Sequence, residues 1–238
     1  MTTPDWLERT SLLMGPGKME RFRRAHVLVV GTGGVGAYAA EMLVRAGVGR
    51  LTLLDADRVQ PSNINRQLCA LHSTVGEEKV RVLEQRFKDI NPELGLTVRD
   101  EFLEEQSVGA LLDSAKFDFI VDAIDTIAPK CALIEEAMKR RVRIVSSMGA
   151  GAKTDITQIR FADLWETFHC GLSKAVRTRL KRDGMRRPLP VVFCAQQADP
   201  AALVQVEGER NKKTTTGTVS YMPAVFGCYL AQYVISRL

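Results

Sequence analysis

The sequence predicts an α/β fold in which helices cover both faces of a mostly parallel sheet. Three observations lead to this prediction. An apolar run at 25–30 ends in a glycine-rich turn, and the segment 37–44 after it is typical of a helix. A second apolar run, 51–54, ends at Asp55, nineteen residues after Gly36. Beyond it, short apolar runs alternate with segments of helical periodicity, as in parallel strands joined by crossover helices.

The turn after the first strand has the spacing of a dinucleotide-binding fingerprint. Gly31, Gly33 and Gly36 fit Gly-x-Gly-x-x-Gly, where glycines allow a tight turn, close approach to phosphate and close helix–strand packing. The helix that begins here offers free N–H groups to an anion. Asp55 stands where an acid is expected to meet a ribose hydroxyl. The pattern predicts a Rossmann-like nucleotide-binding fold. Taken alone, it is most typical of a nicotinamide-dependent dehydrogenase.

Length and composition suit one large α/β domain, or one domain with a modest appendage. The chain has 238 residues, of which 45% are hydrophobic and 26% charged, and its net charge of +5 is only a weak indication of a polyanionic partner. The five cysteines are scattered and form no Cys-x-x-Cys pair, which favours a reducing compartment and argues against structural zinc. Residues 1–9 are polar and unlike a signal peptide. We therefore expect a cytoplasmic protein.

The remaining elements follow in order. A short amphipathic helix is expected at 18–24, after the turn 15–17, and Arg9 lies ahead of that turn as an ordinary surface arginine on local grounds. Further helices are expected at 76–90, 104–115 and 129–140, and further strands at 94–98, 117–121, 142–146 and 191–193. The apolar segment 222–238 is short and interrupted, so we expect a core helix, with peripheral contact to a membrane as the open alternative.

A dehydrogenase has no need of the polar loop that follows the second strand. Asp55 and Asp57 come first, and a cluster of polar residues that could face phosphates comes next, comprising Ser62, Asn63, Asn65 and Arg66. A solvated turn is the alternative interpretation. Lys79 lies in the first turn of the next predicted helix, where the helix dipole disfavours a cation. An anionic ligand would explain this lysine, and a plain surface position is the alternative.

Two acids follow the fourth strand. Asp122 and Asp125 lie just beyond its carboxyl end, where open α/β sheets bind their ligands. One or both could hold Mg²⁺ together with waters and phosphate oxygens. Capping of the next helix is the alternative, because Asp125-Thr126 directly precedes it.

The segment 174–187 carries seven cations against one acid, Asp183. Such a run is usually a solvated helix face, and contact with nucleic acid is the alternative that its density raises. The cations expected at RNA are Lys174, Arg177, Arg179, Lys181, Arg182, Arg186 and Arg187.

In order along the chain, these motifs resemble those of the ubiquitin-activating-enzyme-like (ThiF-type) adenylating superfamily. The resemblance covers residues 5–165, and its motifs are Gly31–Gly36, Asp55-x-Asp57, Ser62–Gln67, Val75-Gly76-x-x-Lys79 and Asp122-x-x-Asp125. The rest of the chain is similar to the branch of tRNA threonylcarbamoyladenosine dehydratases, through the segments 121–125, 148–151 and 217–223.

The resemblance implies that ATP adenylates a carboxylate and that pyrophosphate is released. It implies catalytic roles for Arg9, Arg66, Lys79 and Asp125, with Asp125 holding Mg²⁺ and Arg9 reaching into the site of a neighbouring subunit in a homodimer. It implies an adenylating region, 1–165, and a C-terminal region, 166–238, packed on the same domain. The residues expected at the nucleotide are Gly31, Gly33, Gly34, Gly36, Asp55, Asp57, Ser62, Asn63, Asn65, Arg66, Lys79, Asp122, Asp125 and Thr126.

Two branches of this superfamily compete. The dehydratases adenylate the threonyl carboxylate of a modified tRNA adenosine, and the ring then closes intramolecularly. The sulphur-carrier activators adenylate the C-terminal glycine of a small protein, and many hold zinc between two Cys-x-x-Cys pairs that this chain lacks. The basic segment favours tRNA, so a sulphur-transfer or carrier protein is the alternative partner. Ring closure needs no enzyme nucleophile, and Cys170 and Cys194 stay open as alternative acyl acceptors.

Overall fold

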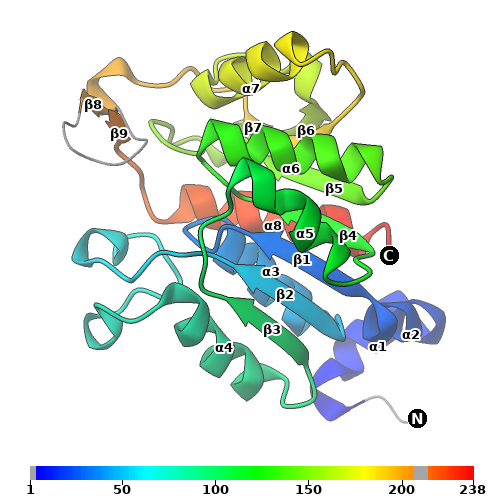
Figure 1. Ribbon diagram of the computed structural model, residues 1–238. Coiled ribbons are helices and arrows are strands. Elements are labelled where there is room, and N and C mark those ends of the chain that lie inside the picture. The colour runs from blue at the N-terminus through cyan, green and yellow to red at the C-terminus, as the bar shows by residue number, and fades with distance from the viewer. Residues whose placement is uncertain (1–3, 206–213) are drawn as a thin grey trace.

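The computed structural model describes residues 4–205 and 214–238, and a seven-stranded sheet forms its centre. The strands lie in the order β3-β2-β1-β4-β5-β7-β6 (Figure 1), and every neighbouring pair is parallel except β7–β6. Their bounds are β1 His26–Val30, β2 Arg50–Leu54, β3 Gly95–Arg99, β4 Phe119–Asp122, β5 Arg143–Ser147, β6 Ile159–Asp163 and β7 Pro190–Cys194. This confirms the predicted α/β fold with its mostly parallel sheet.

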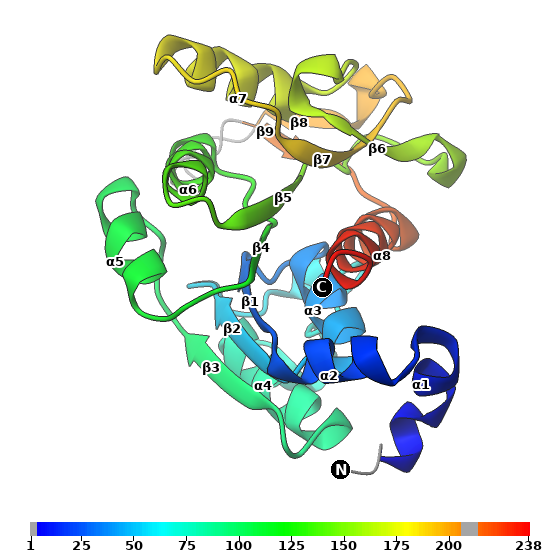
Figure 2. The ribbon, with the colours of Figure 1, turned by 90° about the vertical axis from the view of Figure 1, so that its right-hand side faces the viewer.

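Helices cover both faces of the sheet (Figure 2). Two separate hydrophobic cores show how successive strand residues divide between the faces, because Val27 and Val29 lie in one core and Leu28 and Val30 in the other. The first core contains α3 (Gly36–Arg45), α4 (Lys79–Ile90) and α8 (Tyr221–Ile235). The second contains α5 (Val108–Asp113), α6 (Ile127–Lys139) and α7 (Gly171–Arg182).

The strand order reverses at β1. From β1 the chain continues to β2 on one side, whereas β4 pairs with β1 on the other side, with Val30 opposite Asp122. The loops that leave β1 and β4 therefore begin side by side at the carboxyl edge of the sheet. Open α/β sheets bind ligands at this kind of switch point.

Two helices lie before the sheet, α1 (Glu8–Met14) and α2 (Pro16–Arg24). The sequence predicted α2 but not α1. Leu7, which directly precedes α1, is buried. A Cβ on Gly47, in the turn before β2, would lie only 2.9 Å from the Leu7 side chain. Both helices thus lie at the amino ends of the strands, across the sheet from the switch point (Figure 1).

The C-terminal part of the chain completes the same sheet. Strand β7 inserts between β5 and β6, and β6 is an antiparallel edge strand that the sequence analysis missed, as it missed the hairpin of β8 (Leu203–Gln205) and β9 (Thr214–Thr216). The expected core helix is confirmed as α8, in which Phe226, Leu230 and Val234 are fully buried. Within the described residues, no helix combines the length and apolarity needed to cross a membrane.

Two helices have bounds in the structure that differ from the segments expected from the sequence. Helix α4 begins at Lys79 and not at residue 76, because Gly76 has a positive φ of 90° and Glu78 bridges to Arg58. In the basic segment, α7 ends at Arg182, and Gly184 with φ 80° follows in a loop. The segment 174–187 is therefore helical only in its first part.

Candidate active site

Two glycines of the loop after β1 are required by the chain itself. Gly31 has φ 85°, and a Cβ there would lie 2.8 Å from the carbonyl oxygen of Ala123. A Cβ on Gly36 would lie 1.8 Å from the carbonyl oxygen of Gly31. Any side chain at either position would push the loops after β1 and β4 apart. The tight turn and the close helix–strand packing expected of this fingerprint are thus both present.

The other two glycines differ from this pair and from each other. A Cβ on Gly34 would lie 3.1 Å from Pro223 in the first turn of α8, so packing explains this glycine. A Cβ on Gly33 would contact only the side chain of Gln67, at 3.7 Å, which is an ordinary contact distance. The side-chain oxygen of Gln67 is buried with no hydrogen-bond partner in the described part of the chain. A glycine (Gly33) beside a buried side-chain oxygen that lacks a hydrogen-bond donor (Gln67) is the arrangement expected where a ligand approaches the backbone.

The carboxylate of Asp55 holds the glycine loop against the end of β2. Its Oδ2 accepts hydrogen bonds from the backbone N–H of Thr32 at 2.6 Å and from the Thr32 hydroxyl at 3.0 Å. Its Oδ1 accepts from the backbone N–H of Asp57 at 2.9 Å. The acid is therefore oriented before any ligand arrives, at the position where a ribose is expected. Thr32 is a supporting residue that the sequence analysis missed.

Lys79 is a buried cation at this edge. Its side chain is only 4% exposed, and its Nζ lies 2.7 Å from Oδ2 of Asp57, whose side chain is 71% exposed. The backbone N–H of Lys79 also donates to the carbonyl of Asp57, so the start of α4 is fixed to the loop after β2. The carboxylate of Asp57 accounts for a cation in the first turn of a helix. The pair places one ammonium group beside Asp57, whose backbone N–H donates to Asp55.

The polar loop brings most of its predicted residues together. Arg66 Nη1 donates to the carbonyl of Ser62 and to the side-chain oxygen of Asn65, both at 2.8 Å. Asn65 in turn donates to the carbonyl of Thr218 at 3.0 Å, which ties the loop to the segment before α8. Asn63 differs, because it is buried and its side-chain oxygen accepts from the N–H of Gln60 to close a tight turn. The prediction that Asn63 faces phosphate is therefore corrected, and Asn63 instead stabilises this turn.

Asp122 also departs from expectation. Its side chain and that of Lys130 are both fully buried, and their charged atoms lie 2.8 Å apart. The hydroxyl of Ser146 and the N–H of Ile124 donate to the same carboxylate, at 2.6 and 3.1 Å. A carboxylate enclosed in this way cannot reach a metal ion or a nucleotide. The prediction that Asp122 contacts the ligand is corrected, and Asp122 instead fixes the loop after β4.

Asp125 is the accessible acid of this loop. It is exposed, and it directly precedes Thr126, the N-cap residue of α6. Within residues 4–205 and 214–238, no group of three or more histidines, cysteines or acids lies together so as to hold a metal ion. An ion bound through one protein carboxylate, with phosphate oxygens and waters completing its shell, matches the habits of Mg²⁺.

Arg9 is not part of this edge within one chain. It is exposed on α1, at the amino ends of the strands, whereas the glycine loop follows the carboxyl end of β1. Its guanidinium makes no hydrogen bond or ion pair within the part of the chain that the structure describes.

The seven cations of the basic segment form two groups. Arg177 donates to the carbonyls of Leu164 and Thr167, at 3.2 and 2.9 Å, and also to the Thr167 hydroxyl. Arg179 pairs with Glu105 and Asp183, and Arg182 also pairs with Asp183. Arg177 and Arg179 thus bind distant parts of the fold, which corrects the expectation that all seven cations face RNA, whereas Arg182 stays 68% exposed. Of these seven, the exposed cations whose side chains have no partner among the described residues are Lys174, Lys181, Arg186 and Arg187.

The two cysteines considered as acyl acceptors lie next to a buried lysine. Cys194 is fully buried, so no substrate can reach its thiol. Cys170 is half-buried at the N-cap of α7, where its Sγ accepts from the N–H of Ser173 at 3.5 Å. Lys153 is 4% exposed and donates to the carbonyl of Cys194, and burial lowers the pKa of this lysine. Of the two, only Cys170 stays a candidate.

Comparisons with known proteins agree with this geometry. A model of the ThiF family matches residues 7–238. A tRNA threonylcarbamoyladenosine dehydratase of Bacillus subtilis is 36% identical over 241 residues, which cover 97% of this chain and 93% of that protein. The crystal structure of Escherichia coli tRNA N6-threonylcarbamoyladenosine dehydratase in complex with ATP superposes with a TM-score of 0.89 at 34% identity, covering all of this chain and 96% of that one. The molybdopterin-synthase adenylyltransferase of E. coli is 33% identical over 63% of this chain and 60% of its own length.

Proposed function

Since the chain belongs to the ThiF family, we propose that it is an ATP-dependent tRNA threonylcarbamoyladenosine dehydratase. One observation carries the proposal. The glycine loop, the oriented carboxylate of Asp55 and the cations of Arg66 and Lys79 all lie at the carboxyl edge of the sheet, around its switch point. Hydride transfer needs no such cations, whereas a triphosphate does. The relative solved with ATP has the same fold over its whole matched length.

Each residue of this edge has a proposed task. The backbone at Gly33 lets the nucleotide approach, and Asp55 accepts hydrogen bonds from the ribose hydroxyls. Arg66 and Lys79 neutralise phosphate oxygens, and Asn65 and Ser62 hold Arg66 in place. Gln67, which sequence reasoning left without a role, adds an acceptor for a donor of the ligand. We place this work in the region 1–165, with 166–238 presenting the second substrate.

The reaction is difficult because both partners are anions. A carboxylate oxygen of the modified adenosine attacks the α-phosphorus of ATP, a new O–P bond forms, and pyrophosphate leaves. A nucleophile within the same nucleoside then attacks the activated carbonyl carbon and loses its proton, and AMP leaves with the former carboxylate oxygen, so that the nucleoside loses the elements of one water. The cationic groups lower the barrier to the first step by stabilising charge that accumulates at phosphorus. The second step is intramolecular and uses proximity in place of an enzyme nucleophile.

Mg²⁺ fits the one accessible acid of the loop after β4. Asp125 supplies the protein carboxylate, and the ion would neutralise phosphate charge when it is bound there with the triphosphate. Thr126, at the N-cap of α6, lies next to the phosphates in this arrangement.

A homodimer would bring Arg9 to the nucleotide. The support for this lies in α1, where Leu12 and Leu13 are 80% and 81% exposed beside Arg9 and form an apolar face typical of an interface. Inactive Arg9→Ala protein mixed with inactive Asp125→Asn protein would regain activity, because a mixed dimer contains one intact composite site. Failure to complement despite demonstrated subunit exchange would contradict a role for Arg9 across the dimer.

We propose that the protein works in the cytoplasm. All five cysteines are free of disulfides, which agrees with a reducing cytoplasm. The described residues contain no zinc-type cluster, and the proposed mechanism uses none.

Carrier-protein adenylation is the second candidate. The exposed cations of α7 and the loop after it favour RNA, and the molybdopterin-synthase adenylyltransferase matches less of the chain than the tRNA enzymes do. ATP–pyrophosphate exchange separates the two. We expect exchange to depend on tRNA that carries threonylcarbamoyladenosine, and not to occur with unmodified tRNA. Exchange that depends on a small carrier protein with a free C-terminal glycine, and not on tRNA, would contradict the proposal.

A further inference from the structure

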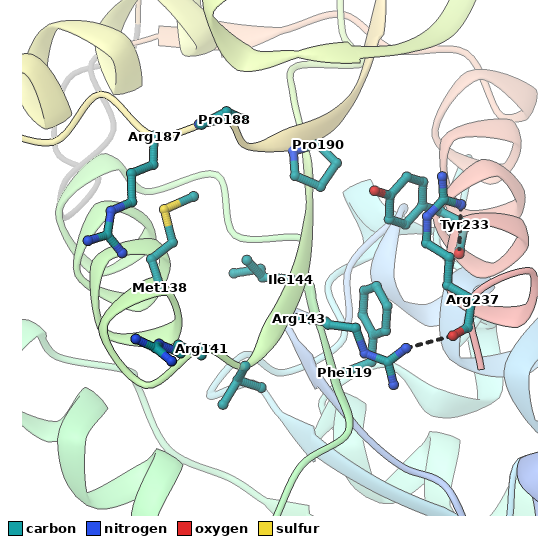
Figure 3. Close-up of a pocket in the computed structure, with 11 residues that line it drawn as sticks. Phe119, Met138, Arg141, Arg143, Ile144, Arg187, Pro188, Pro190, Tyr233 and Arg237 are labelled. Atoms are coloured by element: carbon teal, nitrogen blue, oxygen red, sulfur yellow. Dashed lines mark hydrogen bonds between the residues drawn. The ribbon is translucent and has the colours of Figure 1, made fainter.

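A cavity lies at the opposite end of the sheet from the candidate nucleotide site. Its volume is about 450 Å³, and it opens at the amino ends of β4, β5 and β7, between the last turns of α6 and α8. Figure 3 shows Arg141 and Arg187 on one side and Arg143, Arg237 and Tyr233 on the other. Ile144 and Pro190 lie between them.

The cavity exists because two neighbouring strands separate. β5 and β7 pair only at Ser146–Val191 and Ser147–Val192, near the carboxyl end of β5. The first three residues of β5, beginning at Arg143, therefore have no partner on the β7 side. The gap is floored by apolar side chains such as Val142 and Ile144, so it offers a flat apolar surface between cationic walls.

The charge of the cavity has one sign. Four arginines line it, and no aspartate or glutamate is among the residues that do so. Two of the arginines are held by the protein, since Arg143 donates to the carbonyls of Asp118 and Arg237, and Arg237 lies over the ring of Tyr233. Arg141 and Arg187 make no side-chain hydrogen bond or ion pair to any described residue. Their guanidinium groups are thus available to an anion.

Both available arginines are fixed through their backbones. Arg141 has φ 57°, a conformation that favours glycine, so an arginine there is strained by the turn that it occupies. The carbonyl of Arg187 accepts a hydrogen bond at 2.9 Å from the indole N–H of Trp165, which anchors the loop after α7. The turn between α6 and β5 would fold more easily with glycine, so its own geometry does not call for a cation.

Helix α7 connects this cavity with the active-site edge. It begins near the carboxyl end of β5, where a Cβ on Gly149 would lie 3.5 Å from Cys170 Sγ, and its chain continues into Arg187 and the start of β7. Its 12 residues span about 18 Å. Lys174 and Lys181 on its exposed surface and Arg186 after it extend the available cations between the two ends.

We propose that this cavity binds a second stretch of the substrate tRNA, away from the modified adenosine. Arg141 and Arg187 bind backbone phosphates, and the apolar floor accepts a ribose or a base face. Guanidinium groups and apolar surfaces are both suited to nucleic-acid strands. The proposal rests on the proposed function, because it assigns this cavity to the same RNA. It makes α7 the path along which the RNA backbone runs to the nucleotide site.

The test uses the double variant Arg141→Gly/Arg187→Gln in the whole protein. Glycine relieves the strained turn, so we expect the melting temperature to stay unchanged or to rise. Each phosphate contact contributes about 0.7 to 0.9 to the log–log salt slope of tRNA binding, so the slope falls by roughly 1.4 to 1.8. If binding at 1 M salt is unaffected, the affinity at 0.1 M falls roughly 25- to 60-fold. In activity assays the KM for tRNA rises, whereas kcat and the KM for ATP do not change.

The control is Arg21→Gln, which removes one exposed cation of α2 that does not line the cavity. We expect its tRNA affinity and salt slope to match those of the unaltered protein. An unchanged slope and affinity in the double variant, or an equal loss in Arg21→Gln, would overturn the cavity proposal and leave the proposed function intact. Failure of the unaltered protein to bind tRNA would contradict the proposed function itself, and the cavity proposal with it.

Discussion

The roles of residues in the loop after β1 can be predicted from the sequence more fully than the roles of residues in the basic segment. In the loop, the spacing of Gly31 and Gly36 reflects two close backbone contacts, one of Gly36 with Gly31 and one of Gly31 with Ala123 after β4, and the structure shows both. In the basic segment, seven similar cations include two, Arg177 and Arg179, that pair with other parts of the protein. The role of a motif that constrains the backbone can therefore be predicted from its spacing. The role of a run of charge cannot, because a guanidinium finds partners wherever the fold brings them.

The same contrast exists between the two acids after β4. Asp122 and Asp125 look equivalent in the sequence, yet one is enclosed with Lys130 and the other is exposed. Burial therefore separates the structural acid, Asp122, from the candidate ligand for Mg²⁺, Asp125. The predictions below test these divisions, beginning with the largest expected effect.

Asp125→Asn is expected to abolish ATP–pyrophosphate exchange and to leave the melting temperature unchanged. Asparagine keeps the size of the side chain and removes the negative charge that would hold the metal. Asp122→Asn is the matched comparison, because it should lower the melting temperature by leaving Lys130 without its counter-charge. Exchange retained by Asp125→Asn would remove this residue from the proposed site.

Lys130→Met is expected to destabilise the protein by about 3–5 kcal/mol, because it leaves the buried carboxylate of Asp122 without its cation. The double variant Asp122→Asn/Lys130→Met should recover part of that loss. Denaturant unfolding of both variants measures the difference. If the double variant is no more stable than the single one, the pair does not act as a unit.

Gly33→Ala and Gly36→Ala are expected to separate the glycine that serves the ligand from the one that serves the fold. ATP at a hundredfold excess over Kd should stabilise the unaltered protein by about 2.7 kcal/mol. Gly33→Ala should lose this effect at unchanged ligand-free stability, because alanine there meets only Gln67. Gly36→Ala should lower the ligand-free stability by about 1–3 kcal/mol. Thermal unfolding with and without ATP gives both values, and equal behaviour of the two variants would contradict the division.

Arg177→Ala and Lys181→Ala are expected to divide the basic segment. Arg177→Ala should destabilise the protein by about 1–3 kcal/mol, since the carbonyls of Leu164 and Thr167 lose their charged donor. Lys181→Ala should change stability by no more than about 0.5 kcal/mol. It should lower the salt slope of tRNA binding by about 0.7 to 0.9. A stable Arg177→Ala protein would show that the two groups of cations are not distinct.

Much of the fold could be predicted from the sequence, because strands of buried apolar residues and amphipathic helices carry strong local periodicity. Strand β6 was missed because its burial alternates weakly at the edge of the sheet, with only Ile159 fully covered. At the candidate site, spacing could predict Asp55 and Lys79 as candidates, and they stay predictions, whereas the enclosure of Asp122 by Lys130 and Ser146 depends on elements that meet only in three dimensions. The cavity at the amino ends of β5 and β7 has no signature along the chain.

The most direct test of the proposed activity is mass spectrometry of nucleosides from tRNA that carries threonylcarbamoyladenosine, after incubation with the protein and ATP. We expect the modified nucleoside to lose the mass of one water molecule, only when ATP is present, with AMP and pyrophosphate formed in equal amounts. An unchanged nucleoside, with AMP appearing instead on the C-terminal carboxylate of a small carrier protein, would contradict this account.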